Sequence, residues 1–174
     1  MSSYYLQEQL RQGLGELFVR ARAAGLTVSL DPGFDPQQRW GDELLSLLPL
    51  VDVFLPNERE ACAISGKTEP LAALRALANG HTRIVVKLGG DGCVTLRDDG
   101  TPLAVPAHAV AVVDSTGAGD SFDAGFLHAW RLGMPLRDCL RWGSACGSLS
   151  TRGMGGTACQ GNVSDVRALL ETAA

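Results

Sequence analysis

Apolar positions spaced three and four residues apart open the chain. They are Leu6, Leu10, Leu14, Leu17, Phe18 and Ala21. This spacing places the apolar side chains on one face of a helix, which we expect over about residues 5–24 and which Gly13 and Gly15 weaken. The next apolar run, LTVSL at 26–30, is short and is followed by the turn-forming residues DPGFDP. It therefore predicts a buried strand that ends in a loop.

The same alternation of helical and strand patterns continues through the middle of the chain. Helices are expected at 42–48, 57–65 and 71–79, and strands at 51–55 and 83–88. Short, almost wholly apolar strands that alternate with helices are typical of a parallel sheet covered on both faces. The pattern thus predicts a mostly parallel α/β fold.

The character of the sequence changes after Gly89. CVTLR and PLAVP surround the turn sequence DDGT and predict a hairpin. AVAVV at 109–113 predicts one more strand, and helical patterns follow at about 118–132, 136–151 and 163–172. No repeat, linker or low-complexity tract interrupts the chain, so we expect a single domain over residues 1–174.

Composition and charge narrow the classes of partner. The 174 residues are 45% hydrophobic and 20% charged, which suits a globular domain with a real core. The net charge of -4 gives no sign of a positively charged binding surface, so we expect neither nucleic acid nor a membrane as a partner. The five cysteines include no CxxC pair, which favours a reducing compartment. The sequence also has no signal-peptide pattern and no long apolar run, so we expect the protein in the cytoplasm.

The stretch DSTGAGDSFDAGF at 114–126 is the strongest candidate for chemistry. Gly117 and Gly119 lie between an expected strand and an expected helix, where backbone N–H groups and the helix dipole attract anions. The stretch is not a Walker A loop, because no Lys-Ser or Lys-Thr pair follows. It also fails the dinucleotide-binding pattern, because Phe122 stands where the third glycine belongs.

Asp120, which follows this loop, has two interpretations. It is either a base that accepts a hydroxyl proton while the loop holds a phosphoryl group in transfer, or an acid that only complements the helix dipole. Composition and spacing leave both open.

The same stretch resembles the C-terminal signature of the ribokinase-like carbohydrate kinases, the PfkB family. Residues 114 and 116–120 match its pattern Asp-Thr-x-Gly-Ala-Gly-Asp. The resemblance implies a ribokinase-like three-layer α/β/α fold with a mostly parallel sheet and a C-terminal hairpin. It also implies that Asp120 is the catalytic base, that Gly117, Ala118 and Gly119 form an anion hole, and that ATP with Mg²⁺ phosphorylates a sugar hydroxyl.

VFLPNEREA at 53–61 is similar to the family's Asn-x-x-Glu element. The resemblance implies that Asn57 and Glu60 organise Mg²⁺ and the ATP phosphates, with Glu60 acting on the metal largely through water, which suits a cation that retains its hydration shell. The alternative is a helix capping box, since Asn at a helix start with Glu three residues later has that form. We expect both roles.

Two further segments resemble the nucleotide side of these kinases. In VVKLGGDGC, Lys87, Gly89 and Gly92 are implied ATP contacts, and the alternative is a plain hairpin turn with a solvated lysine. In SACGSLSTRGMGGT, Ser144 is an implied nucleotide contact, and some members form a monovalent-cation site, here for K⁺, with the segment that contains Asp114 and Thr116. A helix end stopped by glycines is the alternative there.

The resemblance covers nearly the whole chain but corresponds only to the C-terminal, nucleotide-binding and catalytic part of such a kinase. The N-terminal part, with the substrate lid, is expected to be absent, so the chain alone is expected to be weakly active or inactive. An exposed sheet edge would then favour association, including a homo-oligomer. The other hypotheses are a non-catalytic nucleotide-binding or assembly module, and a nucleoside or vitamin kinase of the same fold.

Overall fold

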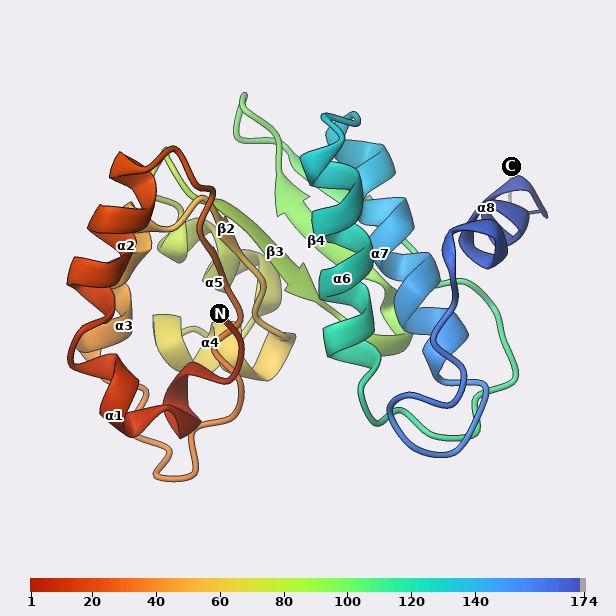
Figure 1. Cartoon of the computed structure of the whole chain (residues 1–174), viewed down its shortest axis with the longest axis horizontal. Coiled ribbons are helices and arrows are strands. Elements are labelled where there is room, and N and C mark those ends of the chain that lie inside the picture. Colours follow the sequence, from red (N-terminus) through yellow and green to blue (C-terminus); the bar gives the residue numbers. More distant parts are fainter. Residues whose placement is uncertain (173–174) are drawn as a thin grey trace. The chain divides into compact units, whose positions relative to one another are not determined.

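The computed structural model describes residues 1–172, which form two compact units (Figure 1). Unit 1 comprises Met1–Lys87 with Val94–Pro102. Unit 2 comprises Leu88–Cys93 with the described residues from Leu103 onward. Each unit is described by itself below.

Unit 1 is built on parallel strands. β1 (Ser29–Leu30), β2 (Val53–Phe54) and β3 (Arg83–Lys87) pair in parallel, with Ser29 opposite Val53 and Val53 opposite Arg83. Val53 and Phe54 are completely buried, as expected for a strand with a neighbour on each side and covered faces. The parallel α/β pattern predicted from the sequence is confirmed.

The helices of unit 1 are η1 (Tyr4–Leu6), α1 (Glu8–Arg11), α2 (Leu14–Ala23), α3 (Asp42–Leu47), η2 (Leu48–Leu50), α4 (Glu58–Ser65) and α5 (Pro70–Leu77). They bury apolar side chains, except α1, which has no buried residue. The single helix expected over 5–24 is wrong, because Gln7 and Gly13 leave the helical region and divide it into three pieces. Glycine lowers helix propensity by about 1 kcal/mol relative to alanine, which makes Gly13 a natural break.

The predicted hairpin is present. η3 (Gly89–Asp91) precedes β4 (Cys93–Leu96) and β5 (Pro102–Val105), and the strand order is β1-β2-β3-β4-β5. At the turn, the backbone N–H of Arg97 donates to the carbonyl of Thr101 at 2.8 Å.

Unit 2 is dominated by helices. α6 (Ala118–Arg131) and α7 (Leu136–Ser150) pack side by side, and α8 (Val163–Thr172) follows a long loop (Figure 1). Apolar side chains between the first two helices form its core, and Phe122 and Phe126 are stacked with ring centroids 6.4 Å apart. Three helical patterns read from the sequence are therefore confirmed.

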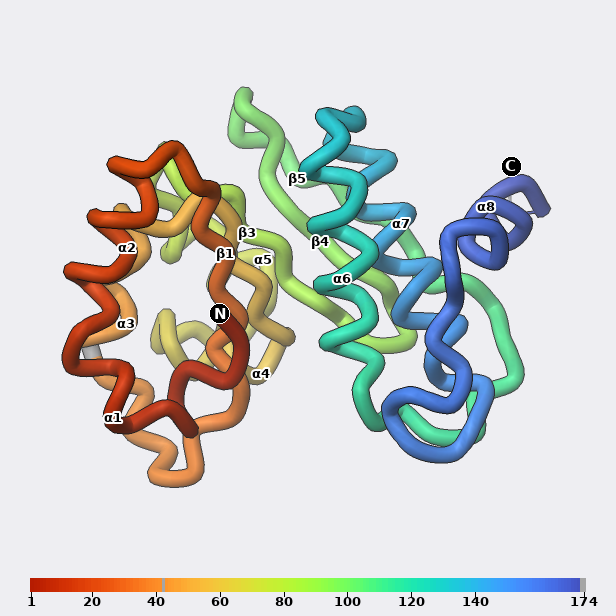
Figure 2. Tube along the Cα trace, in the orientation of Figure 1, coloured from red at the N-terminus to blue at the C-terminus, as the bar shows by residue number. Residues whose placement is uncertain are grey.

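The strand predicted at 109–113 is wrong. This segment lies in the irregular stretch between β5 and α6, which the tube in Figure 2 follows. Val112 and Val113 are 66% and 55% exposed, and the N–H of Val113 donates to the carbonyl of Thr151 at 2.8 Å instead of to a strand. The apolar run at 109–113 therefore does not correspond to a buried strand.

Within residues 1–172, no helix has the length and apolar character needed to cross a membrane.

Candidate functional site

Polar residues follow all three parallel strands of unit 1. Asp31 comes directly after β1, Asn57 shortly after β2, and Lys87 ends β3. The backbone of Lys87 forms an isolated parallel bridge with Asn57, and its N–H donates to the carbonyl of Pro56 at 2.9 Å. Because carboxyl ends of parallel strands meet at one edge of a sheet, these residues share the edge at which α/β folds bind ligands.

Asn57 and Glu60 form the predicted capping box at the start of α4. The Oδ1 atom of Asn57 accepts the backbone N–H of Glu60 at 2.9 Å, and Oε2 of Glu60 accepts the backbone N–H of Asn57 at 2.8 Å. Glu60 is only 6% exposed, and this burial raises the pKa of its carboxyl. The capping role is confirmed, and the metal role stays a prediction.

Lys87 is paired with Asp31. Its Nζ atom donates to Oδ2 of Asp31 at 2.7 Å, and the two side chains are 10% and 13% exposed. Oδ1 of Asp31 accepts the backbone N–H of Gly33 at 2.8 Å, which fixes the carboxylate at the start of the loop. Lys87 is therefore not a solvated turn lysine.

The sequence leaves two equal interpretations of Asp31, which is not among the predicted site residues: an acid that faces the nucleotide or phosphate region because it follows an expected strand, or part of an Asp-Pro-Gly turn. The bond from Gly33 confirms the turn, and a ligand contact stays a prediction.

In unit 2, Asp114 organises the glycine loop. Its Oδ1 atom accepts the N–H and the hydroxyl of Thr116 at 2.9 and 2.8 Å, and Oδ2 accepts the N–H of Gly155 at 2.8 Å. These bonds, led by the backbone N–H of Thr116, hold the pKa of the Asp114 carboxyl below its usual range. Asp114 and Thr116 thus have a loop-closing role, and a cation role for them stays a prediction.

Gly117 has the left-handed backbone that the loop requires, with φ 73°. A Cβ atom placed on it would lie 2.8 Å from the Cα of Gly156. The two backbone segments therefore approach too closely for any residue other than glycine at position 117. α6 begins at the next residue, Ala118. The first-turn N–H groups of any helix lack partners within it. Here the N–H of Ala118 donates to the carbonyl of Ser115 at 3.2 Å, in the loop before the helix.

Asp120 is an exposed acid in the first turn of α6, directly after Gly119. A helix start favours a negative charge there, so its placement suits the dipole interpretation as well as the catalytic one. The residues predicted as the anion hole and the base are thus gathered at one helix start.

The remaining candidates have structural roles of their own. Gly92 has φ 93°, and a Cβ on it would lie 2.0 Å from the carbonyl oxygen of Val105. Gly89 begins the same turn, which closes with the N–H of Leu88 donating to Gly92 at 2.8 Å. Ser144 is buried on α7, and its hydroxyl donates to the carbonyl of Pro106 at 2.9 Å. Their nucleotide contacts stay predictions.

Oxygen ligands suit a hard cation such as Mg²⁺, and a Mg²⁺ ion that retains several waters needs only one or two carboxylates. Among the side chains that the structure describes, no group of three or more from His, Cys, Asp or Glu is placed to hold a metal ion. Glu60 is a buried carboxylate at the ligand-binding edge with Asp31 near it, and this donor set fits a cation held mainly through water and phosphate.

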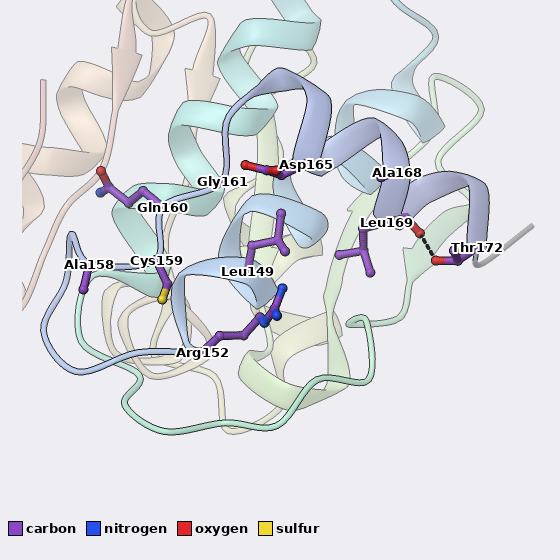
Figure 3. Close-up of a pocket in the computed structure, with 10 residues that line it drawn as sticks. All are labelled: Leu149, Arg152, Ala158, Cys159, Gln160, Gly161, Asp165, Ala168, Leu169 and Thr172. Atoms are coloured by element: carbon purple, nitrogen blue, oxygen red, sulfur yellow. Dashed lines mark hydrogen bonds between the residues drawn. The ribbon is translucent and has the colours of Figure 1, made fainter.

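Unit 2 also contains a pocket of about 630 Å³ between the end of α7, the following loop and α8 (Figure 3). The residues around it are Leu149, Arg152, Ala158, Cys159, Gln160, Gly161, Asp165, Ala168, Leu169 and Thr172. None of the site residues predicted from the sequence lines it, so it gives no support to their roles.

Comparison with known proteins supports the family resemblance that the glycine loop suggested. The model of the pfkB family carbohydrate kinases matches residues 1–162. The chain is 32% identical over 140 residues to the cytidine kinase of Thermococcus kodakarensis, which covers 79% of this chain and 49% of that protein. It is 31% identical over 136 residues to the ribokinase of Haemophilus influenzae, covering 75% of this chain and 42% of the relative.

Solved structures give the same result for the fold. The fructokinase of Vibrio cholerae O395, bound to fructose, ADP and calcium, has a TM-score of 0.86 at 25% identity and covers 98% of this chain and 59% of its own. The ribokinase of Arabidopsis thaliana, with ribose and ATP, has a TM-score of 0.76 at 29% identity and covers 90% and 51%.

The chain spans about half the length of these relatives. The ribokinase-like fold predicted from the sequence is confirmed by these likenesses, and the chain belongs to the pfkB family of carbohydrate kinases.

Proposed function

We propose that this protein contributes the nucleotide-binding and catalytic residues for ATP-dependent phosphorylation of a sugar hydroxyl. The observation that carries the proposal is the exposed Asp120 in the first turn of α6, directly after the Gly117 turn that only glycine can make. The relatives named as ribokinase and fructokinase support the acceptor class.

In the proposed step, the carboxylate of Asp120 accepts the proton of the acceptor hydroxyl. The hydroxyl oxygen forms a bond to the terminal phosphorus of ATP, and the bond from that phosphorus to the ADP oxygen breaks. Backbone N–H groups at Gly117, Ala118 and Gly119 stabilise the negative charge on the transferring group. When bound, Mg²⁺ would offset the phosphate charge, and Asn57 and Glu60 would hold it through its water molecules.

Gly89, Gly92 and Ser144 are proposed to shape the nucleotide side, and Asp114 with Thr116 to serve a K⁺ site. Association with further copies and a cytoplasmic location likewise stay predictions. Since the chain spans about half the length of its relatives, we expect the isolated chain to bind MgATP and to turn it over weakly or not at all.

Calorimetry with MgATP, followed by an assay of ADP release on a panel of fructose, ribose and nucleosides, tests the proposal. Binding with sugar-dependent ADP release supports it. Binding without release on any acceptor fits both an inactive part of a kinase and the module that only binds nucleotide. Release only with nucleosides favours a nucleoside kinase, for which the cytidine kinase relative is the specific observation. Absence of MgATP binding contradicts the proposal.

A further inference from the structure

Unit 2 contains a pocket that the proposed function does not use. It lies between the end of α7, the following loop and α8, and its volume of about 630 Å³ is in the range of small-molecule sites (Figure 3). Apolar side chains from both helices line part of it, namely Leu149, Ala168 and Leu169. Polar and charged side chains line the rest, so the pocket suits a molecule with an apolar part and a polar part.

Close packing holds the walls of this pocket in place. On the helices, Nη2 of Arg141 in α7 donates to the carbonyl of Leu170 in α8 at 3.1 Å. On the loop, a Cβ atom added to Gly161 would lie 2.5 Å from Cδ1 of Leu149, so the loop backbone lies directly against the side chain from α7. Contacts within unit 2 therefore fix both α8 and the loop against α7.

Arg152 supplies a positive charge to the pocket. Its side chain is exposed, and within the part of the chain that the structure describes, its guanidinium group has neither a hydrogen bond nor an ion pair. In Figure 3 it lies beside Leu149, and Leu169 extends toward them from α8. An arginine side chain can bind a carboxylate through two parallel hydrogen bonds. A ligand whose apolar part covers the guanidinium group excludes water from this pair, which strengthens it.

Asp165 limits the charge that a ligand can carry. It also lines the pocket, and its Oδ2 atom accepts the backbone N–H of Asn162 at 2.9 Å. Among the described residues around the pocket, Arg152 and Asp165 are the only two with charged side chains. A second negative charge on the ligand would increase its repulsion by Asp165, so the lining favours a ligand with a single negative charge.

We propose that this pocket binds a small monocarboxylate with an apolar chain or ring. The carboxylate pairs with the guanidinium group of Arg152, and the apolar part lies against Leu149 and Leu169. The inference does not depend on the proposed function, because none of these three residues is assigned to nucleotide binding or to catalysis.

Calorimetry on the full chain tests the class of ligand, with hexanoate as the probe. Acetate has the same charge but almost no apolar part, and it should bind at least about tenfold more weakly. Hexylammonium has the same chain and the opposite charge, and it should also bind at least about tenfold more weakly. Hexyl phosphate carries more negative charge and should bind more weakly than hexanoate.

Two variants test the residues of the pocket. Arg152→Gln removes the positive charge and should weaken hexanoate binding by about fivefold to tenfold. Ala168→Glu places a second carboxylate at an exposed position of the lining and should weaken it by at least about threefold. Arg167→Gln is the matched control, because Arg167 is an exposed arginine of α8 that does not line the pocket. It should leave the dissociation constant within about twofold.

Several results would overturn the proposal. One is the absence of hexanoate binding up to about 10 mM, and another is equal binding of hexanoate and hexylammonium, which would show that apolar contact alone is responsible. An unchanged affinity for hexanoate in Arg152→Gln or Ala168→Glu, or an equal loss in Arg167→Gln, would show that the carboxylate does not bind in this pocket. Tighter binding of hexyl phosphate than of hexanoate would exclude a monocarboxylate as the preferred ligand.

Discussion

The carboxylate of Asp114 accepts the backbone N–H of Gly155 at 2.8 Å, across 41 residues of chain. The same carboxylate closes the turn at Thr116, so a single side chain ties the loop before α6 to the loop after α7. The shape of the glycine loop therefore depends on residues that lie well outside the family signature.

Replacement of Asp120 by Asn is expected to abolish catalysis and to spare binding. A catalytic base contributes about 10²- to 10⁴-fold to rate, so any phosphoryl transfer that the protein shows should fall by about that factor. The dissociation constant of MgATP should stay within about twofold. Asp138→Asn is the matched control, because it makes the same change in the first turn of α7. Loss of MgATP binding in Asp120→Asn would instead indicate a structural acid.

Replacement of Gly117 by Ala is expected to distort the loop. The backbone strain of φ 73° costs about 1–3 kcal/mol, and the new methyl group would also meet Gly156. Gly133→Ala is the matched control, because Gly133 has φ 68° and open space around it. Urea unfolding should show a larger loss for Gly117→Ala, by about 1–3 kcal/mol. Equal losses would mean that the contact with Gly156 is unimportant.

The two roles of the Asn57 and Glu60 pair can be separated. Asn57→Ala removes the cap and should destabilise the protein by about 1 kcal/mol in urea unfolding. Glu60→Gln keeps an oxygen that can accept the N–H of Asn57, so stability should change by less than about 1 kcal/mol. The dependence of nucleotide binding on Mg²⁺ should nevertheless fall in Glu60→Gln. If nucleotide binding by Glu60→Gln depended on Mg²⁺ as strongly as binding by the unaltered chain, the pair would only cap the helix and would have no role in metal binding.

Asp35 should make the stability of the loop after β1 depend on pH. Burial disfavours its charge, but the backbone N–H groups of Trp40, Gln37 and Arg39 outweigh this and lower the pKa of Asp35 below 3.8. A lowered folded-state pKa contributes stability above pH 3.8 that is lost as pH falls through the folded value.

Asp35→Asn, which cannot supply two acceptor oxygens, should therefore cost about 1–3 kcal/mol near neutral pH. The difference from the unaltered chain in urea unfolding should shrink in acid, below about pH 3.8. Asp91→Asn at an exposed position is the control. A difference that is the same at every pH would contradict the ionised role of Asp35.

Local sequence patterns predicted most of the helices and strands and the start of α6. The features that they did not predict depend on contacts between residues far apart in the sequence. The capping box was readable because Asn57 and Glu60 are three residues apart, and the α6 start because its glycines adjoin the helix. The pair of Asp31 and Lys87 joins residues 56 apart, which no local pattern reveals. The strand expected at 109–113 failed for the same reason, since a strand requires a neighbour and Val113 binds Thr151 instead.

The capping box has an evolutionary consequence. Because Asn57 and Glu60 satisfy each other's backbone at the start of α4, natural selection for folding alone would retain them in a descendant that had lost catalysis. Asp120 is exposed, so folding constrains it less. In a survey of degenerate kinases of this fold, survival of the Asn-x-x-Glu element would therefore say little about activity, and loss of the acid after Gly-Ala-Gly would say much.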